Sequence, residues 1–234
     1  MVDRRLLVDE LRNFALVLTT DYPVSDALHD FVDATTAIFD IRGAGVSLDR
    51  AGRLEFATAS PADIAALEEF QESRQAGPSV EAFRTGTPVL VTDLASDPAR
   101  WPELTAIAAE HEIVSLASFP LHLHGDRLGA LDLYDARPHA WTEEEVECAE
   151  LLAAHATGYL ANASRLDRVR QTAAQLQEAL DSRVVIEQAK GVLAGQHAIP
   201  VDQAFEVLRA YARRERLPLR EVARMVVAGE GRPP

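Results

Sequence analysis

The chain has 234 residues, of which 37 are acidic and 23 are basic, for a formal net charge of −14. It has no uncharged apolar run of about 18 residues, and charges interrupt its N-terminal stretch, so we expect neither a membrane span nor secretion. The single cysteine, Cys148, forms no internal disulfide, which agrees with an expected cytoplasmic location.

The charge is divided unevenly along the chain. Residues 1–164 hold 28 acidic and 11 basic side chains, a net charge of −17, whereas residues 165–234 hold 9 acidic and 12 basic, a net charge of +3. Nucleic acids are held mainly through Lys and Arg, so the acidic total argues against a nucleic-acid partner only for the first part. The shift predicts a boundary close to residues 165–182.

The first part alternates between helical and strand patterns. Apolar residues recur at spacings of three and four over residues 6–19 and 25–40, which predicts two amphipathic helices, with Ser25 as the N-cap of the second. Short strand and helix patterns follow over residues 43–49, 53–60, 61–75, 78–84 and 87–92. Gly52 accepts the positive φ of a hairpin turn between the first two strands.

Residues 114–135 predict two long strands joined by a tight turn at residues 124–126. Thr142, followed three residues later by Glu145, forms a capping-box pattern that opens a long helix. Strands set among helices, with hairpins between neighbours, indicate a largely antiparallel sheet covered by helices, an α+β fold.

Candidate catalytic residues in this part lack the surroundings that catalysis requires. Asp93 and Asp97, or Asp132 and Asp135, provide pairs of carboxylates, but no nucleophile elbow, phosphate-binding glycine loop or metal motif accompanies them. Acidic residues in loops and at strand ends are usually solvated or capping. We therefore expect no enzyme activity.

Candidate metal ligands are similarly isolated. His122 and His124 are two residues apart, so a strand would place them on one face, but they adjoin a turn and have no acidic or cysteine partner. This favours the interpretation that both histidines lie at the solvated end of a hairpin over a metal site. Cys148 lies in a helical pattern where a small buried residue is the simpler interpretation. We expect no cofactor and no metal.

Residues 77–153, which include GPSVEAFRTGTPVLVTDL and FPLHLHGDRLGALDLYD, resemble the GAF domain in the version common in actinobacterial regulators. The resemblance covers roughly residues 10–163. It implies a five- or six-stranded antiparallel sheet with flanking helices, used to sense a small molecule or to dimerise. The ligand is unknown, since the signature of cyclic-nucleotide binders is absent and no cysteine stands where a bilin would attach.

A heptad pattern follows in the connector. Apolar residues repeat at spacings of three and four at Leu166, Val169, Ala173, Leu176 and Leu180. The pattern also fits a single amphipathic helix packed on its own domain, but its continuity with the preceding helix favours a coiled coil and a homodimer. With fewer than three full heptads, the seam needs supplementary contacts between the sensor domains.

The last part contains three apolar-periodic segments separated at residues 195–200 and 217–218, which predicts three short helices. It closely resembles the ANTAR domain. The residues that carry this resemblance are Arg183, Ile186, Ala189-Lys190-Gly191, Leu193, Ala204, Leu208-Arg209, Ala212 and Val222-Ala223. The predicted domains are a GAF sensor over residues 1–163, a coiled-coil connector over 164–182 and an ANTAR domain over 183–234.

The resemblance implies RNA binding. ANTAR proteins act as dimers that capture paired hairpins in nascent leader RNA, so that an intrinsic terminator cannot form. Lys190, the only lysine, provides a point charge suited to a phosphate, and Tyr211 provides a ring for an unpaired base. The candidate RNA-binding residues are Arg183, Lys190, Arg209, Tyr211, Arg213 and Arg214.

Simpler interpretations of these residues stay open. Lys190 is alternatively a solvated helix residue, and Tyr211 a partly buried core aromatic. Arg209 and Arg213 alternatively pair with Glu206 and other acidic neighbours. The bundle itself is alternatively a helix-turn-helix that binds duplex DNA, or the protein-binding part of a dimeric sensor or scaffold.

Overall fold

The computed structural model describes residues 2–17 and 23–230. Residues 18 and 19 of the first predicted helix lie outside the described part. The chain divides into two compact units, residues 1–165 and 166–234. None of the described helices is both long and apolar enough to cross a membrane.

The first unit is built on a five-stranded antiparallel sheet, which confirms the predicted α+β class. Its order is β2-β1-β5-β4-β3, so the two hairpins lie side by side and Gly45 of β1 faces Asp132 of β5. The strands are β1 (Gly43–Arg50), β2 (Arg53–Ser60), β3 (Val89–Val91), β4 (Ser115–Leu123) and β5 (Asp126–Asp135).

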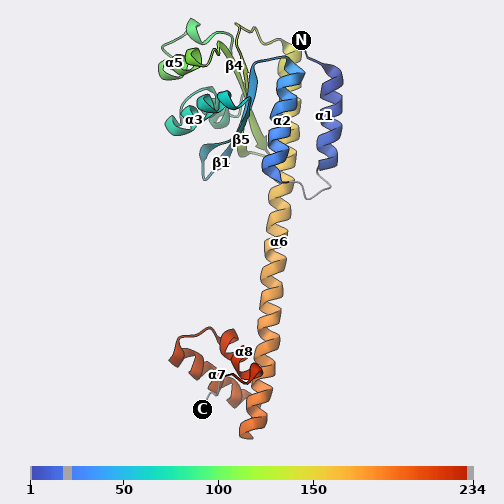
Figure 1. The fold of residues 1–234 in the computed structure, drawn as a ribbon, viewed down its shortest axis with the longest axis vertical. Helices are drawn as coiled ribbons and strands as arrows, with labels where there is room; N and C mark the ends of the chain where they lie inside the picture. Colours follow the sequence, from blue (N-terminus) through green and yellow to red (C-terminus); the bar gives the residue numbers. More distant parts are fainter. Residues whose placement is uncertain (1, 18–22, 231–234) are drawn as a thin grey trace. The chain divides into compact units, whose positions relative to one another are not determined.

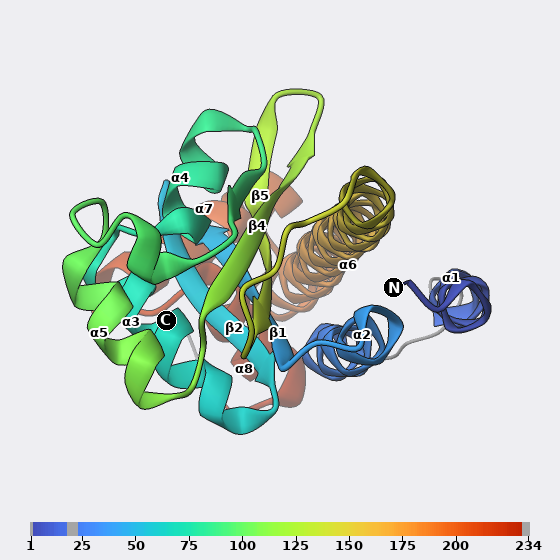
Figure 2. The same ribbon diagram turned by 90° about the horizontal axis from the view of Figure 1, so that it is seen from above.

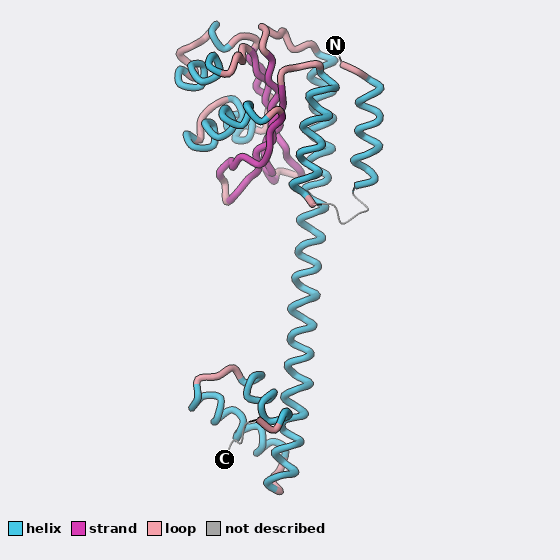
Figure 3. The backbone as a smooth tube through the Cα atoms, in the orientation of Figure 1, coloured by secondary structure: helices cyan, strands magenta, loops and turns pink. Residues whose placement is uncertain are grey.

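Helices cover both faces of this sheet (Figures 1 and 2). One face is covered by α2 (Val24–Phe39) and the first part of α6 (Glu143–His197), with α1 (Arg4–Val17) packed against α2. The other face is covered by α3 (Ala65–Arg74), α4 (Pro78–Thr85) and α5 (Pro102–Glu110). Short 3-10 turns, η1 (Ala62–Ile64) and η2 (Leu94–Ser96), connect these elements. The sheet is therefore the middle of three layers (Figure 3).

Each face of the sheet has its own apolar core. Phe31 of α2, Phe119 of β4 and Leu152 of α6 belong to the core on the first face. Leu67 of α3 and Tyr134 of β5 belong to the core on the second face. Successive residues of a strand point to opposite faces, which is why one strand supplies both cores.

Both predicted hairpin turns are present. Ala51 and Gly52 have φ values of 55° and 83°, and the Gly52 N–H donates to Asp49 Oδ1 at 2.8 Å. In the second turn His124 also has a positive φ, 51°, so it leaves the strand that carries His122. The two histidines therefore do not share a strand face, because His124 already belongs to the turn.

The predicted capping box at the start of α6 is confirmed. Glu145 Oε2 accepts the Thr142 N–H at 2.9 Å, and the Glu145 N–H donates to Thr142 Oγ1 at 3.3 Å. Burial raises the pKa of Glu145, but hydrogen bonds from Thr142 and His139 outweigh it and lower this pKa to about 2.

The predicted Ser25 cap of α2 is wrong. Pro23 is the N-cap of α2, since proline's fixed φ suits this entry, and Ser25 bonds Asp26 instead.

The second unit contains the rest of α6 together with α7 (Val201–Glu215) and α8 (Leu219–Ala228). The last two predicted helices are thus confirmed, whereas the first is the end of a 55-residue helix. Isolated glycines at 158, 191 and 195 do not break it, because a single glycine costs a helix only about 1 kcal/mol. Ala189, Ala204 and Ala212 are buried in the apolar core of this unit.

Two carboxyl groups lie inside the first unit, Glu68 on α3 and Asp132 on β5, and both are fully buried. Glu68 accepts hydrogen bonds from Ser47 Oγ at 2.8 Å and from Tyr134 OH at 2.9 Å. Gly45 makes room for it, since a Cβ there would lie 2.1 Å from Glu68 Oε1. The Glu68 carboxyl therefore occupies a space that the strand backbone keeps open.

The expectation of solvated or capping acids is wrong for β5. Asp132 accepts a hydrogen bond from Ser118, and Asp135, also buried, bonds His139 Nδ1 at 2.9 Å. The reason is topological: β5 is paired on both sides by β1 and β4 and covered by helices on both faces. Asp93 does cap, accepting the Ala95 N–H at 2.8 Å.

The buried pair predicts a pH-dependent stability. Burial and the neighbouring Asp132 raise the pKa of Glu68 well above its usual range, and burial raises the pKa of Asp132 to about 6. The unfolded chain loses these protons at about pH 4, where the folded chain keeps them. The unfolded state then binds fewer protons, so the free energy of unfolding falls as pH rises from about 4 through 6 and above.

We expect Glu68→Gln to reduce this fall by about 2 kcal/mol between about pH 5 and pH 8, because the amide stays neutral. Both tryptophans, Trp101 and Trp141, lie in the first unit, so urea unfolding followed by tryptophan fluorescence reports on it. Glu69→Gln makes the same charge change at an exposed neighbour and serves as the control. An unchanged pH dependence in the Glu68 variant would contradict this account.

Candidate nucleic-acid interface

Two basic side chains from different helices converge on one aromatic ring in the second unit. Lys190 Nζ of α6 lies 5.5 Å from the centroid of the Phe205 ring, and Arg209 Cζ of α7 lies 5.7 Å from it. Phe205 and Arg209 are four residues apart and share one side of α7. The ring attracts both cations through its negative face.

Each of these cations also has an acidic partner. Lys190 Nζ lies 2.8 and 2.9 Å from the two carboxylate oxygens of Glu187, and Arg209 Nη1 lies 3.0 Å from Glu206 Oε1. The Lys190 side chain is only 14% exposed, so it is not the solvated helix residue of the alternative interpretation. The alternative pairing of Arg209 with Glu206 does occur, with the Arg209 side chain 48% exposed. The Arg209–Glu206 pair lies on the surface, where such pairs contribute about 0–1 kcal/mol, so a phosphate competes with Glu206 for Arg209.

Two exposed arginines extend this surface. Arg213 follows Arg209 by one turn of α7, and Arg183 precedes Lys190 by two turns of α6. Both are exposed, and within residues 2–17 and 23–230 neither side chain forms an ion pair or a hydrogen bond. We call the surface formed by Arg183, Lys190, Phe205, Arg209 and Arg213 the Phe205 face.

Tyr211 and Arg214 lie elsewhere on α7. Tyr211 is two residues beyond Arg209, which places it roughly 200° further around the helix. It is partly buried against the bundle core, and Arg214 Cζ lies 4.9 Å from the centroid of its ring. Arg214 Nε also donates to Glu215 Oε1 at 2.8 Å. The six predicted residues therefore form two groups and not one surface.

Phe205 is the residue of this face that is absent from the candidates predicted from the sequence. It is partly buried, and its ring is in contact with the two cations from α6 and α7. Its spacing of four residues from Arg209 was a usable signal. The contact with Lys190 had no such signal, because it depends on how α7 packs against α6.

The first unit offers no metal centre among its described residues. No group of three or more His, Cys, Asp or Glu side chains is placed to hold a metal ion anywhere in the described part. Cys148 is buried in α6, as predicted, and burial raises the pKa of its thiol to about 11. Its thiolate, the reactive form, is therefore scarce at neutral pH.

Several solved structures share the fold of the first unit. The GAF domain of a phosphoenolpyruvate-protein phosphotransferase from Coxiella burnetii is 18% identical with a TM-score of 0.55, over 71% of this chain and 99% of that chain. The corresponding Acinetobacter domain is 15% identical with a TM-score of 0.54, over 69% and 97%. The free methionine-R-sulfoxide reductase of Neisseria meningitidis is 16% identical with a TM-score of 0.53, over 68% and 91%. At these identities the likeness shows the fold alone.

Family models match both units. The GAF domain model matches residues 23–161, more than half of the 234 residues, and the ANTAR domain model matches residues 174–227. The ANTAR match begins inside the predicted connector over residues 164–182. No curated protein compared with the chain matches it. The chain therefore belongs to the GAF domain family and carries, after its GAF domain, an ANTAR domain, the RNA-binding module of antitermination regulators.

Proposed function

We propose that the chain is a signal-responsive regulator that binds hairpins in nascent leader RNA and promotes transcription antitermination. Its GAF domain senses a small molecule or mediates dimerisation. The RNA-binding part of this proposal rests on the convergence of Lys190 and Arg209 on Phe205, inside the segment that the ANTAR model matches. The exposed Arg183 and Arg213 supply further phosphate contacts beside the ring.

The Phe205 face suits a hairpin loop chemically. Sequence-specific RNA recognition targets unpaired bases, which stack on aromatic rings and arginine planes while the backbone phosphates pair with basic side chains. Phe205 and Arg209 provide these planes, and Lys190 a point charge. Glu187 and Glu206 hold the two cations until phosphates replace them. Tyr211 with Arg214 provides a second contact site on the other flank of α7.

A single ANTAR bundle is expected to bind weakly. The net charge of residues 165–234 is only +3, so the electrostatic contribution to RNA binding is modest. Two bundles held in one dimer bind two hairpins with a much higher effective concentration for the second contact. The proposed partner is therefore a leader RNA with paired hairpins, and the proposed active form is a homodimer.

The connector supports this dimer, with its predicted bounds of residues 164–182. Its seam residues Leu176 and Leu180 are 62% and 58% exposed, and Val169 is 59% exposed. Within the second unit these side chains are therefore not packed against other residues of the unit, whereas the alternative interpretation expects packing on the chain's own domain. An exposed heptad seam on a continuous helix is typical of a coiled coil that buries it against a second copy.

The proposal assigns no catalytic step to the chain and places it in the cytoplasm with the nascent transcript. Of the acidic residues considered for catalysis, Asp132 and Asp135 are enclosed in the core and hydrogen-bonded. Asp93 is engaged in capping η2. The Asp132 and Asp135 side chains are buried in the described structure, and Asp93 is partly exposed.

The duplex-DNA alternative receives less support. A helix-turn-helix would use its last helix for recognition, and the basic residues of α8 are Arg220 and Arg224. Arg220 is held by an ion pair with Glu178 of α6. Only Arg224 is then left to bind a base edge or phosphate. The experiments below also test the alternative that the bundle binds protein.

We expect Arg213→Gln to weaken binding to a leader RNA with two tandem hairpins on the order of tenfold, and to lower the salt dependence of binding by about one counterion per bundle. The reason is the loss of one phosphate contact from each Phe205 face. Gel shifts at two or more salt concentrations measure both quantities. Scrambled RNA and duplex DNA serve as competitors.

Arg224→Gln is the matched control, because it removes the same charge from an exposed position on α8. We expect it to leave RNA affinity within about twofold of the parent. A loss of binding in Arg224→Gln with Arg213→Gln unaffected would favour the helix-turn-helix. If the parent prefers neither the hairpin RNA nor duplex DNA over scrambled RNA, the bundle binds protein instead.

We expect Leu176→Glu to weaken the dimer roughly 100-fold or more, because each of two copies places a charge in the seam and loses the burial of a leucine worth about 2 kcal/mol. Mass photometry over a concentration series measures the dissociation constant. Gln175→Glu adds the same charge one position away, outside the seam, and should dimerise like the parent. Equal dimerisation of both variants would show that the seam is not the interface.

A further inference from the structure

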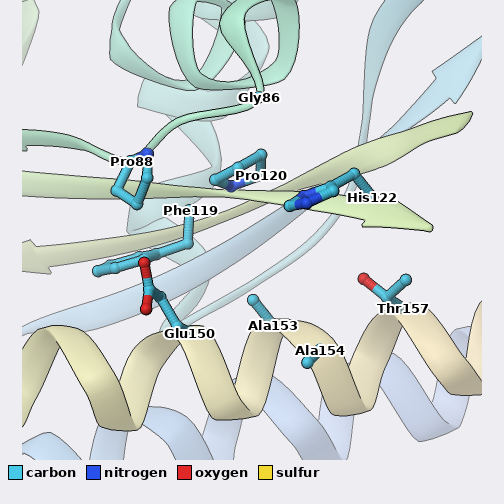
Figure 4. Close-up of a pocket in the computed structure, with 9 residues that line it drawn as sticks. All are labelled: Gly86, Pro88, Phe119, Pro120, His122, Glu150, Ala153, Ala154 and Thr157. Atoms are coloured by element: carbon cyan, nitrogen blue, oxygen red, sulfur yellow. The ribbon is translucent and has the colours of Figure 1, made fainter. Parts of the chain in front are cut away.

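A pocket of about 350 Å³ opens in the first unit between β4, the turn that joins α4 to β3, and the first part of α6 (Figure 4). It lies on the α6 side of β4, away from the layer of α3, α4 and α5 that covers the buried carboxyl pair. Its lining residues come from all three elements: Gly86, Pro88, Phe119, Pro120, His122, Glu150, Ala153, Ala154 and Thr157.

The pocket has an apolar middle with polar groups at its ends. Pro120 of β4 faces the small side chains of Ala153 and Ala154 on α6, and these alanines leave the space open (Figure 4). At one end the Glu150 carboxylate rises from α6 toward the Phe119 ring. At the other end the His122 ring lies above the Thr157 side chain.

The charge of the pocket is negative. Glu150 is its one carboxylate, it is exposed, and within residues 2–17 and 23–230 it forms no ion pair or hydrogen bond. Glu143, in the first turn of the same helix, is exposed, whereas Glu144 pairs with Arg4 and Glu145 with His139. No lysine or arginine lines the pocket to offset Glu150. This field attracts cations and repels anions.

We propose that this pocket binds a small organic cation, a protonated amine carried on an aromatic or other apolar ring. The ammonium group pairs with Glu150, at the end of the pocket that Phe119 lines. The apolar ring lies between the prolines and the alanines, and a polar substituent bonds His122 or Thr157. The volume falls within the usual range for small-molecule sites, about 300–1,000 Å³.

This inference deepens the proposed function by naming the ligand class of the sensor, and its regulatory meaning rests on that function. Four lining residues, Glu150, Ala153, Ala154 and Thr157, belong to α6, the helix that continues through the connector. A ligand in the pocket therefore contacts α6, the helix that also forms the connector. Binding is a property of the first unit and is measured without RNA.

The test is isothermal titration calorimetry of the full chain with three probes of one shape: 2-phenylethylamine, 2-phenylethanol and phenylacetate. We expect the amine to bind at least tenfold more tightly than the alcohol, and the acid not to bind. Glu150→Gln should lower amine affinity at least tenfold, and Ala154→Leu should abolish binding by filling the pocket. Glu147→Gln, the same charge change on an exposed neighbour outside the pocket, should bind like the parent.

Circular dichroism establishes whether each variant is folded. If Ala154→Leu does not fold, Glu150→Gln alone tests whether the pocket binds the amine. Three outcomes would overturn the proposal: no amine binding by the folded parent at millimolar concentration, equal binding of amine and acid, or unchanged amine affinity in Glu150→Gln. None of these outcomes changes the result expected in the gel shifts with hairpin RNA. Failure of RNA binding would likewise leave the amine titration unaffected.

Discussion

Packing of α7 and α8 against the end of α6 is the constraint on which the proposed RNA interface depends. Ala189 of α6 and Ala204 of α7 are both fully buried in the apolar cluster that these helices share. That packing places the centroid of the Phe205 ring of α7 5.5 Å from Lys190 Nζ of α6. A larger residue at either alanine would overpack this contact and separate the cation from the ring. The Phe205 face is thus a consequence of helix packing.

The acidic partners of these cations shape how the interface works. Lys190 and Arg209 are each paired with a glutamate one turn away, which neutralises part of their charge in the free protein. In the proposed complex a phosphate has to displace the glutamate partners, so a single bundle is expected to gain little from electrostatics alone. We therefore expect selectivity to depend on stacking and on two bundles acting together. The net charge of −17 over residues 1–164 disfavours RNA binding to the first unit.

Local signals predicted much of the fold, since they depend on neighbours in sequence. The hairpin turn at Gly52 and the capping box of Thr142 and Glu145 are of this kind. Features that depend on long-range packing were missed. The burial of Asp132 follows from the central place of β5 in the sheet, and the contact of Phe205 with Lys190 follows from the docking of α7. No spacing in one strand or helix encodes either.

The central claim is that RNA lies on the Phe205 face, and photocrosslinking tests it most directly. The full chain is irradiated in complex with a two-hairpin leader RNA, and the attached peptides are identified by mass spectrometry. The account predicts crosslinks at Phe205 and in the segments that carry Lys190 and Arg209. Crosslinks confined to α8 or to the first unit, with none in α7, would contradict it.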